Sequence, residues 1–480
     1  CTPADIQGIA PADTTIVSAT SVAAPAYCNI FGYVTTPNPG PNQVNFQLGL
    51  PTVWNGRFLF AGNGGFAGSL FSPVLSVVVG TSLGFATALT DTGHQGASVF
   101  DASWALNERV KQDDFLVRAV HVSTVASKAI IQGFYGNGIV VSSFFGCSTG
   151  GRQGLLQAQQ YPEDFDGIIA GAPALGNWAA GSNWNIQHLT ASPDSYLPPD
   201  KLALIDAAVL ENCDGRDGVT DGLIQDPRKC TFNPEKLRCK HENDSDCLTA
   251  AQVKTLKAIY AGASTEDGEQ LYSGFTKSDP ALAPLPFLLQ DQFLKVFVFS
   301  DPKYDSLTFD LNNEDDRTQL AEVVDRGGAA ATNPDLSAFI NRGGKLILYH
   351  GWSDPALSPL ETVQYYQDVV QTMGGGFART QESVRLFMAP GMQHCGGGPG
   401  PNVLVTQGLL PNWVLAGIAP DQIIAIHYQN NDPSTGIVTR TMPLCPYPEV
   451  ATFTGGDVNV AANWVCQRHA NQPSSLGSKK

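Results

Sequence analysis

The chain has 480 residues, of which 43% are hydrophobic and 15% are charged, a composition that excludes wholesale disorder. This length exceeds the roughly 250–300 residues at which a single hydrophobic core stops growing, so one large domain with an insertion, or two domains, is expected. The net charge of -16 would repel phosphate backbones and anionic lipid, which argues against nucleic acid and membrane partners.

Alternating strands and helices are predicted from residue 44 to about residue 175, a pattern that indicates a mostly parallel sheet with helices on its faces. Buried strands are predicted over residues 57–61, 86–90 and 139–145. Helices are predicted over residues 114–136 and 151–161. The first strand runs into a glycine-rich loop, and the third ends at the pentapeptide Gly146-Cys147-Ser148-Thr149-Gly150.

The middle third of the chain has a different composition, rich in Pro, Asp and Asn, with four of the ten cysteines between Cys213 and Cys247. It is predicted to be a separate lid domain over residues 176–334. After it, strands are predicted over residues 344–350 and 383–389, on either side of a helix over residues 359–373. The expected architecture is therefore one α/β domain, residues 1–175 and 335–480, whose insertion lies over one end of its sheet.

Ten cysteines without a C-x-x-C pair favour disulfides in an oxidising compartment over zinc ribbons or redox dithiols. Spacing alone does not settle their connectivity. Pairing sequence neighbours gives Cys1–Cys28, Cys213–Cys230, Cys239–Cys247 and Cys445–Cys466, which leaves Cys147 and Cys395 for each other.

The start at Cys1 rather than Met suggests a mature secreted protein whose signal segment has been removed. A lipid-bearing Cys1, as in bacterial lipoproteins, is the alternative. Asn243 lies in an Asn-Asp-Ser sequon, so it is a candidate glycosylation site, which is also typical of secretion.

Ser148 is the candidate nucleophile, because it sits in a G-x-S-x-G pattern between a predicted strand and a predicted helix. The outer glycines, Gly146 and Gly150, permit the tight turn that lifts a serine above the end of a sheet. The alternative is a glycine-rich turn without chemistry, since the bare pattern is common by chance.

A serine hydroxyl needs a base and an acid that orients the base, and in α/β-hydrolases these follow later strands in the order acid, then His. Asp354 follows the predicted strand 344–350, and His394 follows the predicted strand 383–389. The alternatives are an Asp-Pro turn for Asp354 and an ordinary loop histidine for His394.

Cysteines lie beside both members of the candidate Ser–His pair. Cys147 immediately precedes Ser148, and Cys395 immediately follows His394. A disulfide between them would hold their Cα atoms about 5.5 Å apart and bring the serine within reach of the histidine. A merely stabilising bridge is also compatible, but it does not explain the adjacency.

The expected oxyanion donors are the backbone N–H of Thr149, the residue after the nucleophile, and that of Gly64 or Gly65 in the glycine-rich loop 62–66. A plain turn is the alternative for that loop. His350, four residues before Asp354, could support or compete with the base, and His94 could line the pocket. No H-E-x-x-H motif occurs, which argues against zinc catalysis and against any catalytic cofactor.

Residues 213–223 place Asp214, Asp217 and Asp221 at short spacing among glycines, a pattern that can wrap a hard cation such as Ca²⁺. The segment lacks the closing Glu of an EF-hand. A solvated Asp-Gly turn loop is the alternative. A bound calcium would be structural and would tighten the lid.

These motifs resemble those of the tannase and feruloyl esterase family of secreted serine esterases. The resemblance rests on residues 146–154, on Asp354, on His394-Cys395 and on residues 161–173, and it spans essentially the whole chain. It implies an α/β-hydrolase fold, the catalytic residues Ser148, Asp354 and His394 and the bridge Cys147–Cys395. It also implies a lid calcium held by Asp214, Asp217, Val219, Asp221 and Leu223, with Val219 and Leu223 binding through backbone oxygens.

The family resemblance further implies hydrolysis of a phenolic or plant cell-wall ester. Some tannases of the family are cleaved at a dibasic site in the lid, and here Arg228-Lys229 would lie inside a Cys213–Cys230 loop. This favours a feruloyl esterase acting on hydroxycinnamates, with a tannase acting on gallate esters as the alternative. Phe287, Leu288 and Phe293 are candidate contacts to the acyl group. A catalytically silent binding module is the non-enzyme alternative, against which the complete triad argues.

Overall fold

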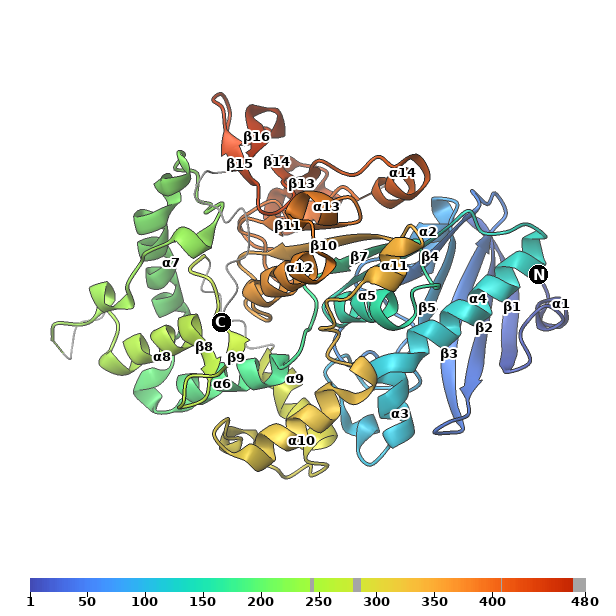
Figure 1. The fold of residues 1–480 in the computed structure, drawn as a ribbon, viewed down its shortest axis with the longest axis horizontal. Coiled ribbons are helices and arrows are strands. Elements are labelled where there is room, and N and C mark those ends of the chain that lie inside the picture. Colours follow the sequence, from blue (N-terminus) through green and yellow to red (C-terminus); the bar gives the residue numbers. More distant parts are fainter. Residues whose placement is uncertain (242–245, 279–285, 407, 469–480) are drawn as a thin grey trace.

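The computed structural model describes residues 1–241, 246–278, 286–406 and 408–468 (Figure 1). Asn243, the candidate glycosylation site, lies outside these residues. In the described part of the chain, no helix is both long and apolar enough to span a membrane.

The described residues form a nine-stranded sheet with the strand order β1-β2-β3-β5-β4-β6-β7-β10-β11. Neighbouring strands from β5 to β11 pair in parallel, whereas β1, β2, β3 and β5 pair antiparallel. The strands are β1 (Thr14–Ala23), β2 (Ala26–Thr36), β3 (Asn42–Pro51), β4 (Arg57–Ala61), β5 (Ala86–Thr90), β6 (Val141–Cys147), β7 (Gly167–Gly171), β10 (Lys345–Gly351) and β11 (Val384–Ala389).

Helices cover both faces of this sheet, so its central strands are buried on both sides, as their nearly continuous apolar sequences require. On β7, Ile168 faces one hydrophobic cluster and Ile169 faces another, because successive side chains of a strand point to opposite faces. The first cluster includes residues of α4 (Ala119–Tyr135), α5 (Thr149–Gln160), α11 (Ser337–Asn341) and α12 (Pro359–Met373), and the second includes α14 (Leu409–Ala416).

A large segment is inserted between two strands that are neighbours in the sheet. β7 ends at Gly171 and pairs in parallel with β10, which begins at Lys345, so residues 172–344 form the insertion. The lid limits expected from composition, residues 176 and 334, lie inside it. Its described elements are α6 (Trp178–Thr190), α7 (Pro199–Cys213), α8 (Ala250–Ala261), β8 (Gly262–Ser264), β9 (Gln270–Ser273), α9 (Pro286–Gln292), α10 (Glu314–Val324) and α11.

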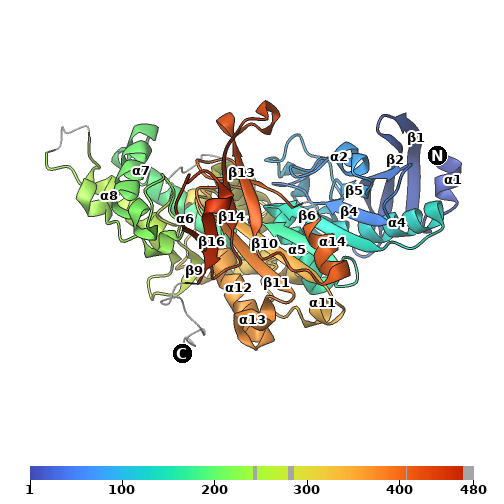
Figure 2. The same ribbon diagram turned by 90° about the horizontal axis from the view of Figure 1, so that it is seen from above.

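The inserted helices α6 to α8 lie at the opposite end of the molecule from β1 and β2, in both views of the ribbon (Figures 1 and 2). Their hydrophobic core is not separate from the rest of the protein. Buried Phe293 and Phe297 of the insertion share one cluster with Phe66, Trp104 and Phe115 from the first half of the chain. The insertion is therefore packed onto the loops that follow β4 and β5.

The C-terminal part adds short strands outside the main sheet: β12 (Val403–Leu404), β13 (Ile423–Tyr428), β14 (Val438–Leu444), β15 (Val450–Phe453) and β16 (Trp464–Gln467). The remaining helices are α1 (Pro3–Gln7), α2 (Val77–Ser82), α3 (Arg109–Asp113) and α13 (Gly376–Thr380).

The expected α/β-hydrolase fold with an inserted lid is confirmed. The predicted strand 57–61 is β4, the predicted strand 86–90 is β5 and the predicted helix 359–373 is α12. Other predictions differ in detail: residues 114–118 form a π-helical turn before α4, β6 begins and ends two residues later than predicted, and the bounds of α5, β10 and β11 differ by one or two residues. The antiparallel strands β1 and β2 were not predicted.

Candidate active site

The candidate nucleophile Ser148 stands in a strained turn between β6 and α5. β6 ends at Cys147 and α5 begins at Thr149, so Ser148 alone makes the change of direction. Its φ of 64° and ψ of -124° lie in a region that residues with a side chain rarely adopt. The backbone N–H of Ser148 donates to the carbonyl of Gly171 on β7 (3.0 Å), which holds the strained residue in place.

Two glycines of the pentapeptide are required by close backbone contacts. A Cβ atom on Gly146 would lie 2.5 Å from the carbonyl oxygen of Gly150, and one on Gly150 would lie 2.7 Å from that of Asn63. Both separations are too short for any larger residue. The G-x-S-x-G pattern therefore lets β6, α5 and the loop after β4 meet at one point.

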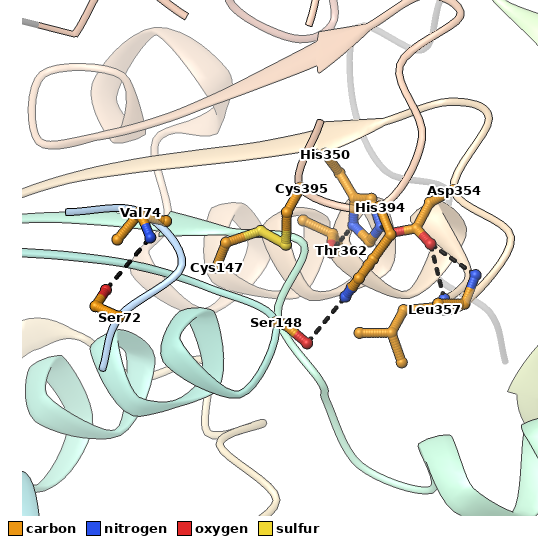
Figure 3. Close-up of a disulfide and its surroundings, with 11 residues drawn as sticks. Ser72, Val74, Cys147, Ser148, His350, Asp354, Leu357, Thr362, His394 and Cys395 are labelled. Carbon is orange, nitrogen blue, oxygen red and sulfur yellow. Dashed lines mark hydrogen bonds and ion pairs between the residues drawn. A yellow bond between two sulfur atoms is a disulfide. The ribbon is translucent and has the colours of Figure 1, made fainter. Parts of the chain in front are cut away.

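His394 bridges Ser148 and Asp354 (Figure 3). Its Nε2 lies 2.9 Å from Ser148 Oγ, and its Nδ1 lies 2.7 Å from Asp354 Oδ2. An ionised carboxylate only accepts hydrogen bonds, so His394 Nδ1–H is the donor to Asp354. In the neutral ring Nε2 then accepts from the Ser148 hydroxyl, which is the arrangement of a general base.

Asp354 and His394 shift each other's pKa. Burial would raise the pKa of Asp354, but the adjacent His394 and the hydrogen bonds from His350 and His394 hold it well below its usual range. Burial would lower the pKa of His394, but the Asp354 carboxylate outweighs this and raises it above its ordinary value. Asp354 is thus ionised at neutral pH, and its charge strengthens His394 as a base.

The five disulfides of the structure are the five pairs given by the sequence-neighbour scheme: Cys1–Cys28, Cys147–Cys395, Cys213–Cys230, Cys239–Cys247 and Cys445–Cys466. The bridge Cys147–Cys395 joins residues 248 apart in sequence and sets their Cα atoms at 5.9 Å. Figure 3 shows it beside the Ser148–His394 contact. A covalent bond therefore links the end of β6 to the loop that carries the histidine.

The glycine-rich loop after β4 is fixed to α5 by side-chain hydrogen bonds. Thr149 Oγ1 donates to the carbonyl of Gly65 (2.7 Å), and Gln153 Oε1 accepts from the backbone N–H of Asn63 (3.0 Å). In the described part of the chain, the backbone N–H groups of Thr149, Gly64 and Gly65 have no protein acceptor. These three residues line the cavity at Ser148, where an oxyanion would form.

A cavity of about 380 Å³ opens at Ser148 and His394 between the sheet and the insertion. Its wall is mainly aromatic and aliphatic and includes Phe66, Phe115, Trp178, Leu289, Phe293 and Val324. Of the residues expected to contact an acyl group, Phe293 lines the cavity, Leu288 is 56% exposed, and the side chain of Phe287 lies outside the described part.

Sequence reasoning did not identify Asn63 and Gln153, since a contact between a loop and a helix 90 residues later leaves no local pattern. His94 does not reach the candidate triad. It stacks on Trp104, and its Nε2 lies 2.8 Å from the carbonyl of Phe66. Burial lowers the pKa of His94 to about 4, so its ring is neutral and donates to this carbonyl.

The loop expected to bind calcium places three carboxylates in one partly buried turn. Burial, together with the neighbouring Asp221 and Asp214, raises the pKa of Asp217 to about 6. Asp221 Oδ2 is buried without a hydrogen-bond donor among the described residues, although Arg440 Nη1 lies 3.4 Å away. An orphaned buried carboxylate oxygen is a feature that a cation would satisfy.

The carboxylates of this loop do not converge as they stand. Asp214 accepts from the backbone N–H groups of Asp221 and Gly222, and Asp217 accepts from those of Val219 and Gln225. Accordingly, no cluster of three or more His, Cys, Asp or Glu side chains suited to a metal ion occurs among the described residues. The composition of the loop fits calcium, whereas binding would require these carboxylates to turn inward.

Comparison with known proteins finds similarity over nearly the whole chain. The family model described as tannase and feruloyl esterase matches residues 28–467. A probable feruloyl esterase B-2 of Aspergillus flavus is 33% identical, over 89% of this chain and 85% of that protein. A mono(2-hydroxyethyl) terephthalate hydrolase of Piscinibacter sakaiensis is 32% identical, over 95% and 87%. The crystal structure of feruloyl esterase B from Aspergillus oryzae has a TM-score of 0.85 at 28% identity, covering 97% of this chain and all of that one.

The raised pKa of His394 predicts the acid side of the pH profile. Ester cleavage needs the neutral ring, so kcat/KM should fall as pH drops through a midpoint above 6.5, the ordinary pKa of histidine. Asp354→Asn removes the charge that stabilises the imidazolium, and the midpoint of its remaining activity should move to lower pH. Initial rates with a methyl hydroxycinnamate between pH 4 and 9 measure both values. A wild-type midpoint below 6.5 would contradict the assignment.

The position of the Cys147–Cys395 bridge predicts that it supports catalysis as well as stability. Replacing both cysteines with Ala should displace the His394 loop and lower kcat by about 10²-fold, the cost of misplacing a reacting group by about 1 Å. The matched control replaces Cys445 and Cys466, whose bridge ties β14 to β16. It should lower the melting temperature and leave kcat unchanged. Unchanged kinetics in the Cys147/Cys395 variant would show that the bridge is incidental to the reaction.

Proposed function

Because this chain belongs to the tannase and feruloyl esterase family of esterases, we propose that it releases ferulic or a related hydroxycinnamic acid from plant cell-wall esters or small phenolic esters. The observation that carries the proposal is the Ser148–His394–Asp354 chain of hydrogen bonds at the mouth of an apolar, aromatic-lined cavity. The cavity binds the acyl group. Ser148 supplies the nucleophile and His394 supplies the base.

The reaction follows from the donor and acceptor pattern of these three residues. Ser148 Oγ attacks the ester carbonyl while His394 Nε2 takes the serine proton, and Asp354 stabilises the imidazolium that forms. The developing oxyanion accepts from the free backbone N–H of Thr149 and from that of Gly64 or Gly65. His394 then protonates the departing alcohol. Water, activated by the same histidine, hydrolyses the acyl-enzyme and restores Ser148.

The cavity wall supports a hydroxycinnamoyl group over a galloyl group. A galloyl ring carries three adjacent hydroxyl groups, and burying each without a partner costs about 1–3 kcal/mol. Among the described residues, the polar side chains of the wall, apart from Ser148 and His394, are Thr149, Arg152, Ser182 and Trp178, which offers one indole N–H. Arg152 already donates to the carbonyls of Leu116 and Ala329, and Thr149 to that of Gly65. A ring with few hydroxyl groups and an apolar linker fits this wall better.

The same proposal places the protein outside the cell. Five disulfides among ten cysteines are typical of an oxidising compartment. It also includes a structural calcium, bound by Asp214, Asp217 and Asp221 with the backbone oxygens of Val219 and Leu223, that neutralises the clustered carboxylates of the insertion. No catalytic step depends on this ion.

The proposed substrate class is tested by comparing methyl ferulate, methyl caffeate and methyl gallate. We expect kcat/KM for ferulate to exceed that for gallate by about tenfold or more, because the wall offers few partners for three hydroxyl groups. Ser148→Ala should bind the preferred ester and release no acid. A preference for gallate would replace the feruloyl esterase assignment with that of a tannase, and turnover by Ser148→Ala would refute the nucleophile.

The calcium proposal predicts a coupled loss of metal and stability. Dialysis against EGTA should remove about one calcium per chain and lower the melting temperature by several degrees, and added CaCl₂ should restore both. Asp217→Asn should reduce the calcium content in the same way, since it removes a charged ligand. Metal analysis by mass spectrometry and a thermal melt provide the readouts. An unchanged melting temperature and metal content after EGTA would contradict the proposal.

A further inference from the structure

A second histidine contacts the carboxylate of the candidate triad. His350 is the penultimate residue of β10 and is fully buried. Its Nε2 lies 2.9 Å from Asp354 Oδ2, and its Nδ1 lies 2.7 Å from the hydroxyl of Thr362 on α12. Figure 3 shows His350 beside Asp354, with His394 lying between Asp354 and Ser148. His350 is not among the residues that line the cavity at Ser148.

The hydrogen atoms of this group follow from what each atom can accept. Asp354 Oδ2 is an acceptor only, so His350 Nε2 and His394 Nδ1 both donate to the same oxygen. When Nε2 carries the only ring hydrogen, Nδ1 accepts from the Thr362 hydroxyl. The other oxygen, Asp354 Oδ1, accepts from the backbone N–H groups of Ala356 (2.8 Å) and Leu357 (3.0 Å). Four donors thus fix both oxygens of the carboxylate.

We propose that His350 is a positioning residue of the reaction, which holds Asp354 in line with His394 and, by donating to Oδ2, weakens the attraction of the carboxylate for the His394 imidazolium. This inference rests on the proposed serine-esterase mechanism. It assigns Thr362 the task of fixing which ring nitrogen of His350 carries the proton. His350 makes no contact with substrate and transfers no proton in the reaction.

A donor to the carboxylate opposes the effect of Asp354 on His394. The negative charge of Asp354 stabilises the protonated form of His394, and each hydrogen bond to the same oxygen draws part of that charge away. Removing the His350 donor should therefore make Asp354 a stronger partner of the imidazolium. The pKa of His394 would rise. The acid limb of the pH profile, where kcat/KM falls as His394 becomes protonated, would then move to higher pH.

Among the described residues, Tyr272 on β9 is electrostatically coupled to this carboxylate, and Glu361 in α12 is coupled to Tyr272. Burial raises the pKa of Glu361, whose Oε1 accepts from the backbone N–H of Ser273. Burial holds the pKa of Tyr272 well above its ordinary value, and its hydroxyl accepts from the backbone N–H of Ser358. Tyr272 stays neutral over the pH range in which His394 titrates. A shift of the acid limb in a His350 variant would thus report on the His394–Asp354 pair.

Four variants of the full-length protein test the inference by their kcat/KM profiles with methyl ferulate. His350→Leu removes the donor and should move the acid limb up by about 0.5–1 pH unit and lower kcat. His350→Gln keeps an N–H group near the position of Nε2 and should restore the wild-type midpoint. Thr362→Val leaves His350 in place but no longer fixes the ring hydrogen on Nε2. It should therefore move the acid-side midpoint of kcat/KM in the same direction, by a smaller amount. His188→Leu, in α6, is the matched control and should leave the limb unchanged.

A purely structural role for His350 gives a different result. His350→Leu and Thr362→Val would then lower the melting temperature, while the acid-side midpoint of kcat/KM would stay at its wild-type pH. This result would overturn the inference. An equal shift in His350→Gln and His350→Leu would also overturn it, because the donor would not be the cause. If His350→Leu does not fold, Thr362→Val and His350→Gln decide. Failure of the serine mechanism itself is seen separately, as turnover by Ser148→Ala.

Discussion

The disulfide between Cys147 and Cys395 is the constraint around which the candidate site is built. Ser148 is held in a strained backbone conformation by the sheet, but His394 lies in a loop that has no strand or helix of its own. The bond joins that loop to the last residue of β6, across 248 residues of sequence. Because loops without regular structure are mobile, a covalent tie is a direct way to keep His394 Nε2 at 2.9 Å from Ser148 Oγ.

The inserted segment contributes the second condition, a cavity with a mainly apolar wall. It leaves the sheet after β7, at the edge where Ser148 and Asp354 lie, and it returns at the start of β10, the strand whose other end leads to Asp354. Its aromatic residues share a buried cluster with Phe66 and Phe115, which also face the cavity. The insertion therefore forms one wall of the cavity, and excluding water there would strengthen the hydrogen bonds among Ser148, His394 and Asp354. Changes in the insertion are expected to act on acyl-group selection.

The parts of the structure that were predicted from sequence have strong local signals. β4 and β5 are short apolar runs that end at glycine or polar loops, and Ser148, Asp354 and His394 directly follow strands or lie in the loops after them. β1 and β2 were missed because neither gives a continuous apolar run: β1 alternates apolar residues with Ser and Thr, and the apolar residues of β2 are interrupted by Asn29 and Gly32. The Asn63–Gln153 and His350–Thr362 contacts join elements that only the folded sheet brings together, so no spacing in the sequence indicates them.

The Cys147–Cys395 disulfide holds Ser148 and His394 together, and we propose that these two residues act as nucleophile and base. The most direct measurement is the site of reaction with a serine-directed organophosphate, located by mass spectrometry of peptides from the inactivated protein. The account predicts one phosphonyl group per chain, on Ser148, and a greatly reduced rate of labelling in His394→Ala, since the serine then lacks its base. Labelling of another serine with loss of activity, or equally fast labelling of Ser148 without His394, would contradict it.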